Sequence, residues 1–422
     1  MIRRIAGSLA RKKGNMMGKA VGLITEYNPF HNGHQYHLQQ AKQLTQADTV
    51  IAVMSGNFVQ RGEPALYDKW QRSAAAVENG VDLVLELPVA FAIQPGPFFA
   101  QGAVEILVAA GVSEIVFGAE HAEWDFMALA KAIQQAPDDS QIFQQYDQPY
   151  ASSYNQMLKE RFKIEITSPN DWLGLSYAFA LLALGQADQV QLRAIQRQGS
   201  AYHAVELHPQ QFASATALRQ ALQNDHLNVE QLALYVPKGT QRLFLEQAPL
   251  DWQPVKQWSL LKYIVMTREI TELEQIYQLN DGLAQRLQKT VQAYWQLEVL
   301  DWDDFMQSFK SKRYTYSRLQ RNLLYVLLNI TQNEMEFAMQ HLYLRPLAFN
   351  VQGQAWLKAL RKQATLPVIG RVNQENSKTI LKLDVRAGRL YEYFQPNHQV
   401  SNKDVHQHPF ILKGASHEME FK

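Results

Sequence analysis

The first half of the chain alternates between short apolar runs and amphipathic stretches, and this alternation limits the possible folds more than any other feature. The apolar runs are typical of buried strands and occupy residues 20–25, 49–54, 82–87 and 114–117. Helix-like stretches between them occupy residues 33–44, 69–78 and 98–109. The pattern continues with a helix at 170–184, a strand at 190–195 and a helix that opens at Ser214. Strands alternating with helices predict an α/β fold with a doubly wound parallel sheet, which binds ligands at the carboxyl ends of its strands.

The alternation stops near residue 235, where several prolines interrupt the chain. Residues 258–341 have the apolar spacing of several amphipathic helices. Beyond residue 345, polar segments alternate with short β-like runs at 367–369, 380–385 and 390–394. We therefore predict a nucleotide-binding catalytic domain at 17–235 and a mostly helical C-terminal region at 236–422 that binds the second substrate.

Composition excludes several classes of site. The chain has 422 residues, a formal net charge of +1 and no cysteine. Without cysteine there is no disulfide, no cysteine-ligated zinc or iron–sulfur cluster and no thiol nucleophile, which is typical of a reducing compartment. The near-neutral charge means that any nucleic-acid binding must come from a local patch. No apolar stretch reaches the ~18 residues of a membrane helix, so we expect a cytoplasmic protein with no membrane segment.

Residues 1–16 carry five positive charges and no acidic residue, and their apolar part is too short for a secretory signal. Two interpretations stay open for this basic N-terminal extension. It is a disordered or transit-like tail, or it results from a start codon placed too far upstream. Met16 and Met17, just before the first predicted strand, favour the second interpretation.

His31 and His34 follow the first apolar run and open the next helix. Residues three apart lie on the same side of a helix, and Gly33 between them lets a ligand approach the backbone. The helix N-terminus offers its amides to phosphate oxygens. The combination predicts a nucleotide site in which imidazoles stabilise the negative charge that develops during attack at the α-phosphate of ATP. A metal site is the rival, but two histidines without a third ligand support it weakly.

A second candidate for phosphate binding lies at Ser214, Thr216 and Arg219. Hydroxyls and helix N-terminal amides suit phosphate oxygens, and an arginine can bind them bidentately. The plain alternative is a helix cap followed by a surface arginine. Residues 55–63 contain two glycines and predict a flexible active-site loop. In the helix that follows, Lys69 and Arg72 either add positive potential or cover the surface.

Longer strings surround these motifs, at residues 22–34, 55–65, 117–120, 168–171, 197–203 and 214–219. The string around His31 and His34 resembles the His-x-Gly-His signature of the nucleotidylyltransferase superfamily. Taken together and in this order, the strings resemble the bacterial tRNA(Met) cytidine acetate ligase family. The resemblance runs from about residue 19 to the C-terminus and is densest in the first 220 residues.

The resemblance implies an enzyme that activates acetate with ATP as acetyl-adenylate and releases pyrophosphate. The acetyl group then passes to N4 of the wobble cytidine of elongator tRNA(Met). It implies that His31 and His34 are catalytic and that Mg²⁺ accompanies ATP, although we see no dedicated carboxylate cluster for the ion. The implied ATP-binding positions are Ile24, Glu26, Asn28, Phe30, His31, Gly33, His34, Gly118, Asn170, Arg197, Ser214, Thr216 and Arg219.

The best local signal for RNA is the stretch 310–321, which holds five basic residues, two tyrosines and no acidic residue. Basic side chains neutralise phosphates, and tyrosine rings stack on unpaired bases. A solvated helix face is the plain alternative. The predicted tRNA-binding residues are Lys310, Lys312, Arg313, Tyr314, Arg318 and Arg321.

Two other functions stay open. One is an adenylyltransferase that joins AMP to a small phosphate ester, although such enzymes are usually shorter and lack a large helical region. The other is a non-catalytic RNA-binding protein on a nucleotidylyltransferase fold, against which the intact His31, His34 and Arg219 argue.

Overall fold

The computed structural model describes residues 18–135, 155, 158–197, 212–223, 229–395 and 401–413. The predictions for residues 1–16 lie outside this part of the chain. At the centre of the described structure is a seven-stranded sheet with the strand order β5-β4-β1-β2-β3-β6-β7. The strands are β1 (Ala20–Thr25), β2 (Thr49–Ser55), β3 (Leu83–Leu87), β4 (Glu114–Ala119), β5 (Gln191–Gln196), β6 (Pro346–Asn350) and β7 (Phe410–Leu412).

The first five strands run parallel, and β6 is antiparallel to β3. Alternate residues of each strand face opposite sides of the sheet, and both sides are covered. In β2, Ile51 and Val53 belong to one hydrophobic core, whereas Val50 and Ala52 belong to another. A strand buried on both faces explains why these runs are almost wholly apolar in the sequence.

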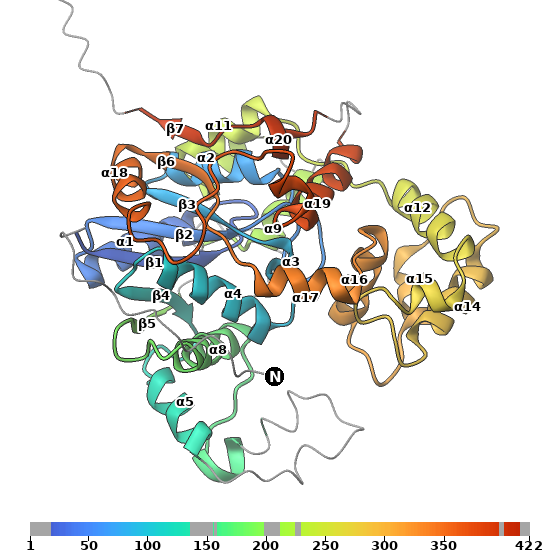
Figure 1. Cartoon of the computed structure of the whole chain (residues 1–422), viewed down its shortest axis with the longest axis horizontal. Coiled ribbons are helices and arrows are strands. Elements are labelled where there is room, and N and C mark those ends of the chain that lie inside the picture. The colour runs from blue at the N-terminus through green and yellow to red at the C-terminus, as the bar shows by residue number, and fades with distance from the viewer. Residues whose placement is uncertain are drawn as a thin grey trace, which may run out of the picture.

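Helices from both halves of the chain cover the two faces (Figure 1). One face packs against α1 (Asn32–Thr45) and α2 (Lys69–Glu78). The other packs against α4 (Gly96–Ala109), α8 (Pro169–Ala183) and α18 (Val351–Leu360). Further short elements of this body are α3 (Val89–Ala92), α5 (Phe126–Gln135), α9 (Ala215–Gln223), α10 (Val229–Leu232), η1 (Ala233–Tyr235), α11 (Lys238–Glu246), η2 (Asn376–Lys378), α19 (Lys382–Tyr393) and α20 (Lys403–His406).

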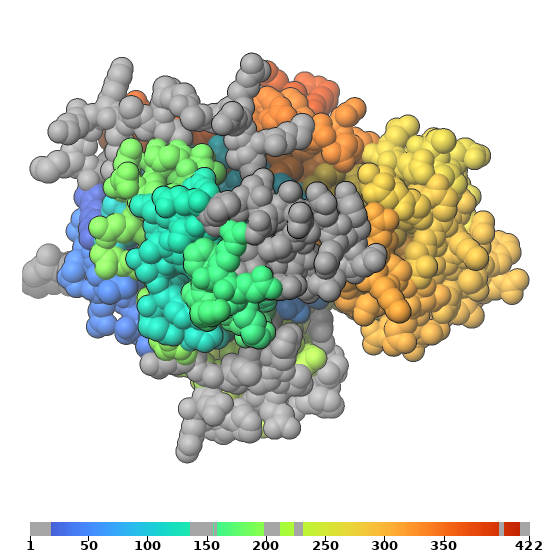
Figure 2. Space-filling model, turned by 90° about the horizontal axis from the view of Figure 1, so that it is seen from below, coloured from blue at the N-terminus to red at the C-terminus, as the bar shows by residue number. Residues whose placement is uncertain are grey.

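A lobe of helices stands beside this body, coloured yellow to orange in Figures 1 and 2. It comprises α12 (Pro254–Met266), α13 (Ile270–Leu273), α14 (Leu283–Tyr294), α15 (Trp302–Phe309) and α16 (Tyr316–Leu327), and α17 (Gln332–Gln340) leads back from it. The fully buried Trp258 and Phe305 pack edge to face inside the lobe. On the side of the body, the Tyr325 hydroxyl of α16 donates a hydrogen bond of 2.6 Å to the carbonyl of Ile93.

The α/β fold with a doubly wound parallel sheet is confirmed, and the predicted strands of the first half agree with β1 to β5 within a few residues. Two β-like runs are wrong. Residues 380–385 and 390–394 fall mostly in α19, where Leu383, Ala387 and Tyr391 recur every four residues and are buried. That spacing is helical, and it outweighs the β propensity of the neighbouring valine and aromatic residues.

The end of the chain returns to the sheet instead of continuing the helical region. Strand β6 adds to the edge of β3, and β7 adds to β6. A buried cluster of charges joins these distant segments: Lys69 Nζ donates to Glu86 at 2.5 Å and to Asp404, and Arg345 donates to the same two carboxylates at 2.9 and 2.8 Å. All four side chains are at most 4% exposed. The C-terminal segment is thereby fixed to the body that β1 to β5 form.

Among the described residues, no helix has both the length and the apolar character needed to span a membrane.

Candidate active site

The candidate site lies where the direction of strand order reverses. From β1 the chain moves to β2 and β3 on one side and then returns to β4 on the other side of β1. In parallel sheets, ligands bind in the crevice that such a reversal opens at the carboxyl ends of the strands. His31 follows the end of β1, Gly118 is the second-last residue of β4, and Arg197 directly follows β5. The structure therefore brings three predicted site segments to the same edge of the sheet.

His31 and His34 form the N-terminus of α1. His31 is the N-cap, and its Nδ1 accepts a hydrogen bond of 3.0 Å from the amide of Gly33. The Nδ1 of His34 accepts a hydrogen bond of 3.3 Å from the amide of His31. The two imidazole rings stack with centroids 3.8 Å apart. The pair is thus a capping box built from histidines, and each ring is fixed by the backbone of the helix that it caps.

These bonds decide which nitrogen carries the proton in the neutral rings. A neutral imidazole has one donor and one acceptor nitrogen, and the backbone amides use both Nδ1 atoms as acceptors. The proton of each neutral ring is therefore on Nε2. Two Nε2–H donors next to a helix N-terminus suit the oxygens of a phosphate group.

The electrostatic surroundings keep the histidines neutral. Burial, reinforced by the nearby charges of Arg197 and Arg219, lowers the pKa of His31 to about 3. Burial, together with His31 and His37, also holds the pKa of His34 well below its usual value. At neutral pH the positive charge of the site is therefore carried by the arginines, and the imidazoles act as hydrogen-bond donors.

Gly33 is required by the ring of His31. A Cβ on Gly33 would lie 2.9 Å from Cε1 of His31, which is closer than real Cβ atoms approach a neighbour. The predicted reason for this glycine, close approach of a ligand to the backbone, stays a prediction. Phe30 is buried and, with Tyr27, packs against the ring of His34. Of the predicted ATP positions, Phe30 and the partly buried Ile24 thus lie against the core.

The second motif lies against the first. Ser214 caps α9, because its Oγ accepts the amide of Ala217 at 3.0 Å. Arg219, in the same helix, donates to the carbonyl of Asn28 at 2.9 Å and to Oγ1 of Thr216 at 3.3 Å. Because Asn28 belongs to the turn before His31, this guanidinium holds the two motifs together. The Asn28 side chain in turn accepts the amide of Leu66 at 2.8 Å.

Glu120, which sequence reasoning did not single out, connects three predicted residues at the end of β4. Its Oε1 accepts a hydrogen bond of 2.7 Å from the Asn170 side chain and lies 3.1 Å from Nε of Arg197. Gly118 leaves room for the Arg197 side chain, since a Cβ there would lie 3.1 Å from its Cγ. The N-cap of α8 is Ser168, not Asn170, so the Asn170 amide group is free to make this contact. The available signals were its position two residues after Gly118 and its place in the string 117–120.

Arg72 is a buried clamp, and Lys69 is equally buried, so the alternative that these two side chains cover the surface is wrong. The guanidinium of Arg72 donates to the carbonyls of Tyr67, Glu26, Ser55 and Gly56, and the side chain is 1% exposed. It thereby ties the end of β1 to the end of β2. Glu26 accepts the amide of Gln60 at 3.0 Å, and burial raises the pKa of its carboxyl. The loop after β2 is therefore attached to the site by its backbone.

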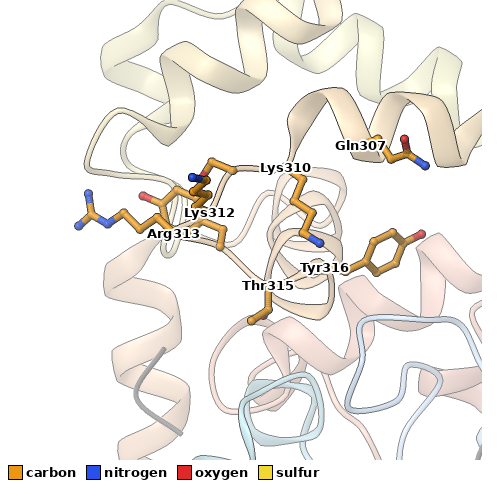
Figure 3. Close-up of a pocket in the computed structure, with 8 residues that line it drawn as sticks. Gln307, Lys310, Lys312, Arg313, Thr315 and Tyr316 are labelled. Atoms are coloured by element: carbon orange, nitrogen blue, oxygen red, sulfur yellow. The ribbon is translucent and has the colours of Figure 1, made fainter. Parts of the chain in front are cut away.

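The stretch 310–321 lies at the start of α16 and is only partly exposed. Lys310, Lys312 and Arg313 are exposed and line a surface hollow of about 710 Å³ (Figure 3). We call it the outer hollow. In that view Lys310 and Tyr316 point to one side and Arg313 to the other. Tyr314 is 7% exposed, and its ring lies beneath the guanidinium of Arg318, 4.7 Å from the ring centroid.

Arg321 is also only 7% exposed. Within this stretch, then, the predicted direct stacking of Tyr314 on a base does not fit its burial. The exposed ring is that of Tyr316, which is 41% exposed.

His37 lies one helical turn after His34, and the sequence identified no partner for it. Its Nε2 is buried without a hydrogen-bond partner among the described residues, and burial lowers its pKa to about 4. The sequence signal was its spacing, since the three histidines recur every three residues along one side of α1. No group of three or more metal-ligating side chains is present in the described ranges.

Comparison with known proteins agrees with this geometry. The family model for "HIGH Nucleotidyl Transferase" matches residues 18–407. Proteins named tRNA(Met) cytidine acetate ligase are similar over nearly their whole length. The one from Leuconostoc mesenteroides is 46% identical over 93% of this chain and 98% of its own, and the one from Limosilactobacillus reuteri is 43% identical over 93% of this chain and 100% of its own.

This chain belongs to the tRNA(Met) cytidine acetate ligase family.

Solved structures of this family have the same fold. Apo TmcAL of Thermotoga maritima has a TM-score of 0.84 with this chain at 29% identity, covering 94% of this chain and all of that one. TmcAL of the same organism bound with α-thio ATP has a TM-score of 0.81 at the same identity. Each match covers 94% of this chain, so the similarity extends beyond the sheet into the helical lobe.

Proposed function

We propose that this protein activates acetate with ATP as acetyl-adenylate and transfers the acetyl group to N4 of the wobble cytidine of elongator tRNA(Met). The observation that carries the proposal is the pair of stacked, neutral histidines at the N-terminus of α1, with Arg197 and Arg219 beside them. The family supplies the acceptor, because its members are named for tRNA(Met), cytidine and acetate.

In the first step, an acetate oxygen attacks the α-phosphorus of ATP and pyrophosphate leaves. Negative charge grows on the phosphate oxygens as the new bond forms. The Nε2–H groups of His31 and His34 are aligned before the reaction by their bonds to the backbone, so they donate to this charge without reorganising. Arg219, held by Asn28 and Thr216, supports this step by placing a fixed positive charge on the triphosphate side.

In the second step, the cytidine N4 attacks the acyl carbon, loses one proton, and AMP leaves. The exocyclic amine is a weak nucleophile because its lone pair is delocalised into the ring, so an activated mixed anhydride is the donor that suits it. The base must be unstacked to reach the anhydride. We infer the cytoplasm as the compartment, since tRNA and ATP are both substrates.

Mg²⁺ is proposed to arrive with the nucleotide. Because the described residues hold no cluster of three metal-ligating side chains, the triphosphate and water would supply most of its ligands. When bound, the ion neutralises phosphate charge. The remaining electrostatic work is done by the side chains described above.

The exposed cations of the outer hollow, Lys310, Lys312 and Arg313, are proposed to contact tRNA phosphates. Arg318 contributes its charge from a guanidinium stacked on Tyr314. Tyr314, predicted to bind tRNA, supports this surface from inside the lobe, and Arg321, also predicted to bind tRNA, is only 7% exposed. On this proposal the helical lobe at 254–340 binds the RNA, while the rest of the C-terminal region belongs to the catalytic body.

Isotope exchange between ATP and labelled pyrophosphate tests the first step. We expect exchange that requires acetate and proceeds without tRNA. Exchange that ignores acetate would contradict the proposal and favour an adenylyltransferase acting on another substrate. No exchange, together with binding of tRNA, would favour the non-catalytic RNA-binding alternative.

A further inference from the structure

A second hollow lies where the helical lobe meets the catalytic body. Its volume is about 580 Å³, and three segments line it. The loop after β2 contributes Gln60 and Glu63, the start of α4 contributes Pro95, and the start of α16 contributes Tyr316, Ser317 and Arg321. We call it the junction hollow. Thr315 and Tyr316 line both this hollow and the outer hollow, so the two adjoin.

Arg321 brings a charge without a counter-ion to the junction hollow. The side chain is 7% exposed, its Nε has no hydrogen-bond partner, and no ion pair with a carboxylate is found for it within the described ranges. Among the groups that act on its guanidinium are the Tyr325 hydroxyl and another cation, Arg318, whose Nε also lacks a hydrogen-bond partner. The Glu63 carboxylate lines the same hollow, where it accepts a hydrogen bond from the Gln320 side chain at 3.4 Å. A buried cation is costly unless an anion or several acceptors compensate it. The hollow therefore offers a site for an anion.

The orientation of α16 adds to this potential. Thr315 caps the helix by accepting the amide of Arg318 at 3.4 Å, so the first turn begins at Tyr316 and Ser317. Both residues line the junction hollow. The positive end of a helix and its first amides favour phosphate groups.

Tyr316 supplies an aromatic surface at the same place. Its ring is 41% exposed, and Figure 3 shows it reaching away from the first turn of α16, on the same side as Lys310. An exposed tyrosine beside a phosphate site is the arrangement that binds an unpaired nucleotide, because the ring stacks on the base while the cation holds the backbone.

The junction hollow is linked to the candidate active site by one short loop. Gln60, which lines the hollow, donates its amide to Glu26. Gly62 sits directly on α16: its φ is +80°, and a Cβ there would lie 2.9 Å from Cα of Arg321. A nucleotide in this hollow would touch the same loop that is anchored at the ends of β1 and β2.

We propose that the junction hollow binds one unpaired nucleotide of the RNA substrate, with its phosphodiester at Arg321 and the first turn of α16 and its base on Tyr316. This inference rests on the proposed function, and it names a site at which the protein would bind its RNA substrate. The contact places the RNA across the lobe and the body at once. Nucleotides next to the modified base would then be bound beside the loop after β2.

Ser317→Glu tests the phosphate contact. The new carboxylate would line the hollow, and an acidic residue in the first turn favours the helix, so folding is preserved. Against an RNA hairpin with the anticodon stem-loop sequence of the tRNA, we expect affinity to fall about tenfold or more and the slope of log K against log salt to become shallower by about one. Ser317→Gln, which has the same size without the charge, should bind nearly normally.

A matched control is Gln292→Glu, which adds the same charge on an exposed position of α14 in the same lobe, outside both hollows. Equal affinities of Ser317→Glu, Ser317→Gln and Gln292→Glu would overturn the phosphate contact. For the base, Tyr316→Ala should lose about 5- to 150-fold in RNA affinity, the usual range for one stacked base, while Tyr316→Phe keeps wild-type affinity. Equal binding by both Tyr316 variants would overturn the stacking role.

Two further readouts separate this proposal from the proposed function. Acetate-dependent exchange of pyrophosphate into ATP needs no RNA, so Ser317→Glu should leave it at the wild-type rate. If the wild-type protein lacks this exchange, the proposed function is refuted. If Ser317→Glu still lowers its RNA affinity, the RNA-binding role of the junction hollow stands. The phosphate group bound in the junction hollow could also come from free pyrophosphate. If Ser317→Glu altered inhibition of the exchange by pyrophosphate and left RNA affinity unchanged, the hollow would be a product site and the RNA proposal would be refuted.

Discussion

The two histidines of the candidate site cap α1, and in the proposed mechanism they also donate to the reacting phosphate. His31 caps α1 through Nδ1, which leaves Nε2 as the donor for a phosphate. A substitution at this position therefore separates a structural loss from a catalytic one, depending on whether the new side chain can still cap.

His31→Asn keeps the cap, because an asparagine oxygen accepts a first-turn amide as well as any residue does. We expect this variant to melt close to the wild type but to lose ~100- to 1000-fold in acetate-dependent exchange, the usual effect of removing one aligned donor. His31→Ala should lose activity similarly and about 1 kcal/mol of stability as well. Wild-type exchange rates in His31→Asn would remove this imidazole from the mechanism.

The neutral state of His31 also predicts how stability depends on pH. In the folded protein its pKa is lowered to about 3, whereas in the unfolded chain the imidazole titrates near its ordinary value. The unfolded state therefore binds more protons between these values, so stability is complete above the unfolded pKa and falls as pH is lowered towards the folded one. At pH 5 the loss due to His31 is up to about 2 kcal/mol.

Urea unfolding at pH 7.5 and pH 5 measures this effect. The wild type should lose more stability between the two values than His31→Asn, which cannot titrate at this position. The same loss in both proteins would mean that burial does not depress the pKa of this ring.

Sequence reasoning at the residue scale singled out the histidine pair and the Ser214–Arg219 motif that the structure places against it, but it did not explain the residues around them. Gly33 was predicted to admit a ligand, whereas the His31 ring already occupies the space that a Cβ would need. Arg72 was compatible with a surface role, yet it is buried against four carbonyls. Such contacts join residues that are distant in sequence, so no local pattern reveals them.

At the scale of elements, the sequence predicted strands and helices well where the apolar pattern of the element itself shows that it is buried. The continuous apolar runs of β1 and β2 predict buried parallel strands, and the structure agrees to within one residue. Strand β6 was missed because its partner is β3, which precedes it by more than 250 residues. A short run such as 346–350 becomes a strand only because the free edge of β3 lies beside it in the folded protein.

The buried charge cluster is the feature that fixes this late segment. Asp404 lies between Lys69 and Arg345, and these two cations hold the pKa of its carboxyl below its usual value in spite of burial. Asp404→Asn would leave an excess of buried positive charge, which typically costs about 3–5 kcal/mol. Asp281→Asn is the matched control, because its ion pair with Arg313 is 3.9 Å long and more than 60% exposed on both sides, so its loss should cost under about 1 kcal/mol.

Chemical unfolding of the two variants under the same conditions gives the comparison. A loss in Asp404→Asn no larger than that in Asp281→Asn would show that the cluster does not hold the C-terminal segment.

At the scale of the whole molecule, the chain divides into a sheet-centred body and a helical lobe, with β6 and β7 returning to the body (Figure 1). The domain boundary near residue 235 stays a prediction; after β5 the described chain is helical up to β6. The return of the chain after residue 340 was not foreseen, since it depends on long-range pairing. This arrangement puts the candidate nucleotide site and the basic start of α16 on two parts that meet at the loop after β2.

The central claim is that this one molecule joins acetate to a tRNA base at the expense of ATP. The most direct test is mass spectrometry of nucleosides from elongator tRNA(Met) after incubation with the protein, ATP and isotopically labelled acetate. The account predicts one labelled acetyl group on the wobble cytidine, formed only when ATP is present and absent with His31→Asn. An unmodified cytidine in tRNA incubated with protein that carries out acetate-dependent exchange would contradict it.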